Sequence, residues 1–202
     1  MKTIVITGPT CSGKTYLSNN LSKIFDNSII LKTDSYYRDD LFIKLLSTFI
    51  YDIYDRIISI KNKSLMHTIT SINNKEKSAK FYNYDFRKKI SSQYIKQIQY
   101  KDNKGILILE GIFAHRLDIN YKKTINILCN ENKEICYERR LKRDLIERGR
   151  NTKEVNKKFF KSWDIYSKYL SVFLNKYNVI QINTVDKASC KQLISKLNYL
   201  IK

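Results

Sequence analysis

The sequence predicts an α/β fold in which a parallel β-sheet is covered by helices on both faces. Short apolar runs alternate with segments of helical periodicity along the whole chain. The apolar runs are continuous, as is typical of strands that are buried on both faces. The 202 residues include one Pro and five Gly, which leaves no composition suited to a linker. We therefore expect one domain that spans residues 1–202.

Five apolar runs are the predicted strands. They lie at residues 3–7, 28–32, 105–110, 124–129 and 178–183. The first run reads TIVIT and is rich in β-branched side chains, which favour strands. Because parallel neighbours need long crossover connections, the segments between the runs should be largely helical.

Apolar periodicity predicts helices at residues 16–25, 40–60, 87–101, 132–147, 152–175 and 187–201. In the first of these, Leu17, Leu21, Ile24 and Phe25 share one face. Residues 64–86 differ, because two alternating stretches flank the polar residues 73–76. This pattern favours a small β-hairpin that turns at residues 73–76.

Composition limits the classes of function. The formal net charge is +19, from 38 Lys and Arg against 19 Asp and Glu, and a basic surface attracts polyanions. No apolar run reaches the roughly 18 residues that a membrane span needs. The N-terminal residues do not resemble a secretory signal, and the four cysteines follow no metal or disulfide spacing. We expect a soluble, reduced, cytoplasmic protein with no membrane partner.

A phosphate-binding loop follows the first strand. Residues 8–15 match G-x-x-x-x-G-K-[ST] at every position: Gly8, Pro9, Thr10, Cys11, Ser12, Gly13, Lys14 and Thr15. In such a loop the backbone N–H groups surround phosphate oxygens at the start of a helix. Lys14 would reach the outer phosphates, and the Thr15 hydroxyl would bind magnesium. The loop predicts a nucleoside triphosphate, ATP or GTP, together with Mg²⁺.

Two acids stand at the carboxyl ends of predicted strands. Asp34 follows the second strand, where a carboxylate can take the proton of an attacking hydroxyl group. Glu110 ends the third strand and is suited to hold a water molecule on magnesium. These positions favour a kinase over other nucleotide-binding proteins.

An arginine-rich segment completes the set of candidate site residues. Residues 139–150 read RRLKRDLIERGR, with four arginines before a glycine and one after it. Arginines on a helical lid can close over a triphosphate and stabilise the charge of the transition state. We expect Arg139 to lie on the solvated face of this helix, and Arg143, Arg148 and Arg150 to be functional.

Together these pieces resemble the uridine kinase family, which comprises uridine–cytidine kinases. The matching stretches occur in the family's order across about residues 3–185. They are Gly8–Thr15, Asp34–Tyr37, Tyr84–Phe86, Glu110–Ile112 and Arg143–Arg150. The phosphate loop is common to many families, whereas the R-D-x-x-E-R-G-R lid is much more particular to this one.

The resemblance implies a role for each matching residue. Asp34 would be the catalytic base and, with Thr15 and Glu110, a magnesium contact; Lys14 and Arg143 would assist the transfer. Arg143 and Arg148 would face the ATP phosphates. The acceptor would be bound by Asp34, Tyr37, Asp52, Tyr84, Arg140 and Arg150. Tyr84 would line the pocket for the base, and Asp52 would hold the ribose.

The family's activity would then be an ATP-dependent phosphorylation of the uridine or cytidine 5′-hydroxyl, a step of pyrimidine salvage. A small-molecule acceptor and a homo-oligomer are also implied. The chain departs from the family at positions that read the base: Ile53-Tyr54 replaces His-Pro, Lys89 replaces a His, and Lys158-Phe159 replaces Gln-Tyr.

These departures leave other acceptors open, namely nicotinamide riboside, ribulose phosphate and pantothenate. A nucleic-acid-binding ATPase would use the positive charge, but the sequence has no stacking or recognition-helix motif, which disfavours a nucleic-acid partner. A third alternative is a non-catalytic relative that only binds nucleotide. The presence of Lys14, Asp34 and Glu110 disfavours it.

Overall fold

The computed structural model describes residues 1–50, 52–100 and 105–201. Its centre is a five-stranded sheet in the order β2-β5-β1-β6-β7, in which every neighbouring pair is parallel. The strands are β1 (Lys2–Thr7), β2 (Ser28–Lys32), β5 (Ile106–Glu110), β6 (Ile125–Cys129) and β7 (Val179–Ile182). The predicted α/β fold and its five strands are confirmed, with ends that shift by about one residue.

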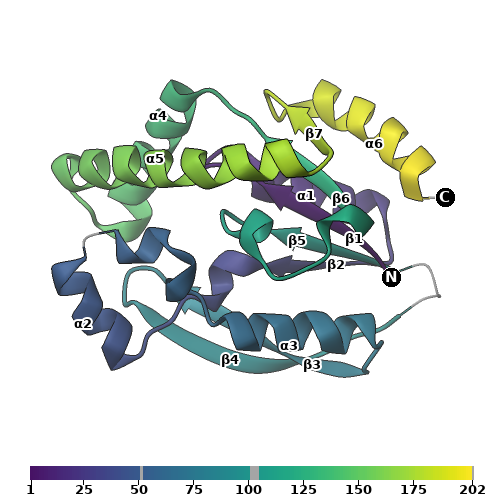
Figure 1. Cartoon of the computed structure of the whole chain (residues 1–202), viewed down its shortest axis with the longest axis horizontal. Helices are drawn as coiled ribbons and strands as arrows, with labels where there is room; N and C mark the ends of the chain where they lie inside the picture. The colour runs from purple at the N-terminus through teal and green to yellow at the C-terminus, as the bar shows by residue number, and fades with distance from the viewer. Residues whose placement is uncertain (51, 101–104, 202) are drawn as a thin grey trace.

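Helices cover both faces of this sheet, as expected for buried parallel strands. On one face, α1 (Lys14–Ile24) and α6 (Lys187–Ile201) bury Leu17, Leu21, Leu193 and Leu197 against apolar side chains of β1, β5 and β6. On the other face, α5 (Thr152–Lys176) crosses in front of the sheet in Figure 1 and contributes Phe173 to a second core cluster. The helix α4 (Lys133–Arg148) packs against α5.

A smaller group of elements lies beside the β2 edge of the sheet, below it in Figure 1. It consists of α2 (Leu41–Phe49), α3 (Asn62–Asn73) and the antiparallel hairpin β3 (Ser78–Asp85) and β4 (Ile90–Gln97). The buried Tyr36 hydroxyl donates to Thr68 Oγ1 on α3 at 3.0 Å, which ties this group to the segment after β2. Within the described ranges, no helix is both long and apolar enough to cross a bilayer.

The predicted position of the hairpin was wrong. Residues 62–73 form α3, because Leu65, Ile69 and Ile72 recur at helical spacing and are buried. The hairpin turns instead between Asp85 and Ile90, where Lys89 has a φ of 55°. The helix expected at residues 87–101 is therefore replaced by β4 over Ile90–Gln97, and residues 101–104 lie outside the described part of the chain.

The helix expected at residues 40–60 was too long. The Asp40 side chain caps its start by accepting a hydrogen bond from Ile43 N at 3.1 Å, and the helix ends at Phe49. Two short 3₁₀ turns follow, at Ile53–Asp55 and Ile57–Ser59. The apolar pattern continues past the end of the helix because Ile53, in the first turn, and Ile60, directly after the second, are also buried.

Candidate active site

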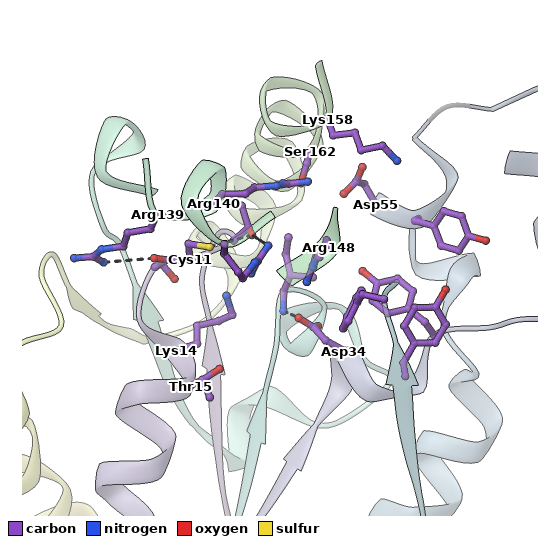
Figure 2. Close-up of a pocket in the computed structure, with 18 of the residues that line it drawn as sticks. Cys11, Lys14, Thr15, Asp34, Asp55, Arg139, Arg140, Arg148, Lys158 and Ser162 are labelled. Carbon is purple, nitrogen blue, oxygen red and sulfur yellow. Dashed lines mark hydrogen bonds between the residues drawn. The ribbon is translucent and has the colours of Figure 1, made fainter. Parts of the chain in front are cut away.

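The carboxyl ends of the strands open into a cavity of about 430 Å³. The phosphate loop, the segment after β2, the hairpin and the lid formed by α4 and the start of α5 all contribute to its lining. Figure 2 shows Lys14 and Asp34 pointing into this cavity, with lid arginines above them. The sheet thus brings together residues that are far apart in the sequence.

The phosphate loop has the backbone geometry that its motif requires. Gly13 caps α1 with a φ of +90°. A Cβ atom at Gly8 would lie 2.7 Å from Cys129 O, so only glycine fits there. Thr10, Cys11, Ser12, Gly13, Lys14 and Thr15 line the cavity, whereas Gly8 and Pro9, which were also predicted to bind ATP, are not part of its lining. The buried Lys14 ammonium donates to Pro9 O at 2.8 Å.

The two predicted acids reach the same end of the cavity from β2 and β5. Asp34 Oδ1 accepts hydrogen bonds from Ile112 N at 3.1 Å and from Thr33 Oγ1 at 3.2 Å. A Cβ atom at Gly111, whose φ is +156°, would lie 2.6 Å from that carboxylate oxygen. The glycine after β5 therefore lets the backbone come close enough to orient Asp34.

Glu110 lies beside the start of α1, where Thr15 Oγ1 donates to Glu110 Oε1 at 3.2 Å. Burial raises the pKa of the Glu110 carboxyl; Lys14 opposes this rise and Asp34 adds to it. Hydroxyl and carboxylate oxygens are the ligands that Mg²⁺ prefers. Among the described residues, no group of three or more His, Cys, Asp or Glu is placed to hold a metal. The donor set fits an ion that shares its coordination with substrate phosphates and water.

Aromatic side chains form the far wall of the cavity. Tyr37 lies 5.2 Å from Tyr84 and 5.7 Å from Phe86, measured between ring centroids, and Tyr54 packs on Tyr37 at 6.2 Å. Burial raises the pKa values of Tyr37 and Tyr84, so both hydroxyls stay protonated. This wall offers flat apolar surface with hydroxyl groups, which suits a ring-containing acceptor.

The structure places Asp55 in the cavity where the sequence pointed to Asp52. The Asp52 carboxylate pairs with Arg56 at 2.7 Å and with Lys161 at 3.5 Å. Asp55, one 3₁₀ turn later, lines the cavity beside Ser162 and Lys158 (Figure 2). Burial raises the pKa of Asp55, although nearby Arg140 lowers it in part. The short turn at residues 53–55 decides which acid faces inward.

The lid arginines close the top of the cavity. Arg140, Arg143, Arg148 and Arg150 all line it. Arg143 Nη2 lies 3.5 Å from Thr10 Oγ1 of the phosphate loop, and the Arg148 guanidinium lies 4.1 Å from the centroid of Phe86. The lid therefore touches both the phosphate loop and the hairpin.

Arg139 is not simply a solvated residue. It is half-exposed, but it pairs with the buried Glu131 at 3.1 Å, and its Nη1 donates to Cys11 O at 3.4 Å. Its exposure agrees with the expected solvated face, but the side chain also lines the cavity. Helical periodicity placed Arg139 on the outer face without showing that the phosphate loop passes beside that face.

Several residues of the cavity were not assigned to a site from the sequence. Tyr54, Asp55, Phe86, Lys89, Lys158 and Ser162 all line it. Phe86 belongs to the Tyr84–Phe86 stretch that matches the family, and Lys89 and Lys158 are positions where the chain departs from it. Lys158 and Ser162 are four residues apart on α5, so a polar pair on one helical face was the available signal.

A buried histidine supports the phosphate loop from behind. His115 Nδ1 lies 2.8 Å from the hydroxyl of Thr7, the residue that precedes the loop. The ring packs edge-on against Tyr166 and Phe173 of α5, with centroids 5.2 and 5.6 Å away. Burial lowers the pKa of His115 to about 3, and Arg116 adds to this effect. The imidazole is therefore neutral at physiological pH.

Comparisons with known proteins agree with this geometry. Residues 3–188 match the model of the phosphoribulokinase / uridine kinase family. The uridine kinase of Haemophilus ducreyi is 30% identical over an alignment that covers 96% of this chain and 94% of that one. The uridine kinase of Haemophilus influenzae (strain PittEE) is 27% identical over 160 residues, 75% of this chain and 72% of that one.

Solved structures show the same fold at low sequence identity. A possible uridine kinase from Bacillus stearothermophilus superimposes with a TM-score of 0.57 at 14% identity, covering 90% of this chain and 88% of that chain. Deoxyadenosine kinase from M. mycoides, with bound dATP, gives 0.55 at 12% identity, covering 97% and 99%. Both are similar to this chain in architecture.

Proposed function

Because the chain belongs to the phosphoribulokinase / uridine kinase family of ATP-dependent kinases, we propose that it phosphorylates the 5′-hydroxyl of uridine or cytidine, giving UMP or CMP. The observation that carries this proposal is the position of Asp34. Its carboxylate is held by Ile112 N between the phosphate loop and an aromatic wall that suits a nucleoside. A cytoplasmic location remains a prediction.

In the proposed reaction, Asp34 accepts the proton of the acceptor hydroxyl as that oxygen attacks the γ-phosphorus of ATP in line. The bond from the γ-phosphorus to the bridging oxygen breaks, and ADP leaves. The backbone N–H groups of the phosphate loop and the Lys14 ammonium bind the transferred group, while Arg143 offsets the charge that spreads over its oxygens.

Thr15, Glu110 and Asp34 would hold Mg²⁺, which would neutralise phosphate charge when bound. Their oxygen donors lie on the phosphate-loop side of the cavity. On the acceptor side, Tyr37, Tyr84 and Arg150 would surround the nucleoside, as the family resemblance implies. Asp55 takes the part first given to Asp52, because its carboxylate lies in the cavity and can accept hydrogen bonds from ribose hydroxyls.

The acceptor is tested by incubating the protein with ATP, Mg²⁺ and one candidate at a time, and by detecting phosphorylated product with mass spectrometry. Uridine or cytidine should be phosphorylated with the highest kcat/KM. Nicotinamide riboside, ribulose phosphate and pantothenate are the competing acceptors, because Lys89 and Lys158 stand in the cavity where the family has other residues. A higher kcat/KM for any of these three would replace the pyrimidine assignment.

The proposed base is tested with Asp34→Asn, which keeps the shape of the side chain and removes its basicity. We expect turnover to fall by about 10²–10⁴-fold, the range for loss of a general base, with ATP affinity little changed. Asp118→Asn removes an exposed carboxylate and is the matched control. Wild-type turnover in Asp34→Asn would show that another group accepts the proton.

A further inference from the structure

One buried carboxylate lies at the centre of the arginine lid. Asp144 of α4 is fully buried, with an exposed fraction of 0%. Four arginines surround it: Arg140 at 3.5 Å, Arg143 at 2.8 Å, Arg148 at 3.5 Å and Arg150 at 2.6 Å. The sequence motif predicts roles for the arginines and none for the acid between them.

The two oxygens of Asp144 divide the arginines into two pairs. Oδ1 faces Arg143 and Arg148, the residues that would face the phosphates of ATP. Oδ2 faces Arg140 and Arg150, the residues that would face the acceptor. One side chain is therefore in contact with both functional halves of the lid.

The backbone of Asp144 anchors the same lid. Its carbonyl oxygen accepts hydrogen bonds from the N–H of Gly149, which ends α4 with a φ of 62°, and from Arg150 N at 3.1 Å. The position of Arg150 therefore depends on both the main chain and the side chain of residue 144. A residue held in this way can fix the direction of its neighbours, as supporting residues do around other sites.

The charges around Asp144 do not balance. Burial alone would raise the pKa of Asp144, but the arginines, Arg143 foremost, lower it overall, so the side chain is a carboxylate at neutral pH. It offsets one of four guanidinium charges, and Glu154 lies 3.7 Å from Arg150 at the rim. The cluster keeps an excess of positive charge directed at the cavity, which suits a polyphosphate.

We propose that Asp144 is a positioning residue that aligns the ATP-facing and acceptor-facing arginines together, so that one carboxylate prepares the lid for both substrates. The assignment of the two pairs rests on the proposed function. Polyphosphate binding does not rest on it, because such binding needs the charges and geometry of the cavity but no acceptor.

The test is Asp144→Asn, with binding of ATP and of tripolyphosphate measured by calorimetry. The substitution makes the cluster more positive, so a simple charge effect would tighten binding. Positioning predicts the reverse, a weakening of about 10- to 100-fold, because misplaced groups lose their contacts with the phosphates. Glu138→Gln, which removes an exposed carboxylate from the same helix, should bind as the wild type does. Unchanged or tighter binding in Asp144→Asn would overturn the proposal.

A second variant separates position from charge, while Asp144→Glu, which keeps the carboxylate on a longer side chain, covers the case in which Asp144→Asn does not fold and should also weaken tripolyphosphate binding. Asp144→Asn combined with Arg140→Gln leaves three guanidinium groups and no carboxylate, which restores the charge sum of the wild-type cluster. Tripolyphosphate binding that is weaker in this double variant than in Arg140→Gln alone supports positioning. Recovery of wild-type affinity would mean that Asp144 only balances charge, and would end the proposal.

Kinetics then show whether one residue serves both substrates. Arg143→Gln should raise the KM for ATP and Arg150→Gln the KM for the acceptor, whereas Asp144→Asn should raise both. If no acceptor is ever phosphorylated but Asp144→Asn loses tripolyphosphate, the proposed function fails and the positioning role stands. An effect of Asp144→Asn on one KM alone would refute the joint alignment.

Discussion

Gly111 shows how a residue without a side chain can decide the chemistry of its neighbours. A Cβ atom there would lie 1.9 Å from Thr33 Oγ1 and 2.6 Å from Asp34 Oδ1, distances that no real contact reaches. Its φ of +156° also falls in a region that other residues rarely adopt. The glycine after β5 is thus part of the arrangement that orients the proposed base.

Gly111→Ala should displace Asp34 and reduce turnover strongly, at a stability cost of about 1–3 kcal/mol. Gly149→Ala is the matched control, because Gly149 also has a positive φ, 62°, but has nothing within 4 Å of the added Cβ. The control should lose stability through backbone strain without the displacement of Asp34. Turnover and thermal unfolding of both variants are the measurements, and wild-type turnover in Gly111→Ala would contradict the orienting role.

Sequence reasoning reached the parts of the site that lie next to each other in the chain or at strand ends. Thr10–Thr15, Asp34 and Glu110 all line the cavity as expected, although their roles remain proposals. It missed Asp55. Whether Asp52 or Asp55 faces the cavity depends on a 3₁₀ turn, and the periodicity of the sequence does not predict that turn. A contiguous motif can be recognised from the sequence alone, whereas the direction in which a single side chain points depends on the tertiary structure.

The hairpin and the lid meet through one stacked pair of side chains. Arg148 at the end of α4 lies over Phe86, which follows β3 and packs edge-on against Tyr84 at 5.0 Å. Arg87 Nη2 also lies 3.5 Å from Ile146 O of α4. Two elements that are separated by more than 50 residues thus share one wall of the cavity.

Phe86→Leu should weaken this contact between the elements. A cation–π contact contributes about 0.5–2 kcal/mol, and Arg148 would face the ATP phosphates, so we expect the KM for ATP to rise roughly 3- to 30-fold. Phe42→Leu is the control, because Arg38 lies 5.8 Å from that ring on α2, outside the residues that line the cavity. Steady-state kinetics with each substrate varied decide the matter; an unchanged KM for ATP would speak against the contact.

The elements that sequence reasoning misplaced are those whose structure depends on a partner. β4 has seven exposed residues of eight, so it lacks the apolar alternation that identifies a strand. Pairing with β3 holds it in place, including the stack of Tyr94 on Phe81 at 6.0 Å. Without knowledge of this partner, the polar composition of residues 87–101 favoured a surface helix.

The molecule as a whole was predictable because its sheet is buried on both faces. All residues of β5 are buried, and a strand buried on both faces is typically a continuous apolar run that can be recognised in the sequence. The order β2-β5-β1-β6-β7 was not predicted, because neighbouring strands are distant in sequence and no local signal encodes their adjacency. That order brings Asp34, Lys14 and Glu110 to one end of the sheet.

The neutral His115 in the core makes the stability of the whole molecule depend on pH. Its pKa is about 3 in the folded state, against 6.5 as the ordinary value, so the unfolded chain takes up a proton first. The stabilising contribution is complete above pH 6.5 and is lost as the pH falls from 6.5 toward 3. At pH 5 the expected loss is about 2 kcal/mol.

Thermal unfolding between pH 7 and pH 5 measures this effect. The wild type should lose more stability over this range than His115→Gln, which has no imidazole to protonate. His67→Gln, a substitution at an exposed position, should follow the wild type. Parallel curves for the wild type and His115→Gln would show that protonation of His115 does not limit acid stability.

The outer side of β4 has a consequence for how copies of the chain behave in solution. Within the described part of the chain β4 has a single strand neighbour, and it exposes Tyr94 and Ile95. An open strand edge of this kind is a template for intermolecular pairing, which Lys96 and a formal charge of +19 oppose by repulsion. Colloidal stability therefore depends on ionic strength: dilute buffer keeps the copies dispersed, and added salt screens the repulsion that separates these edges.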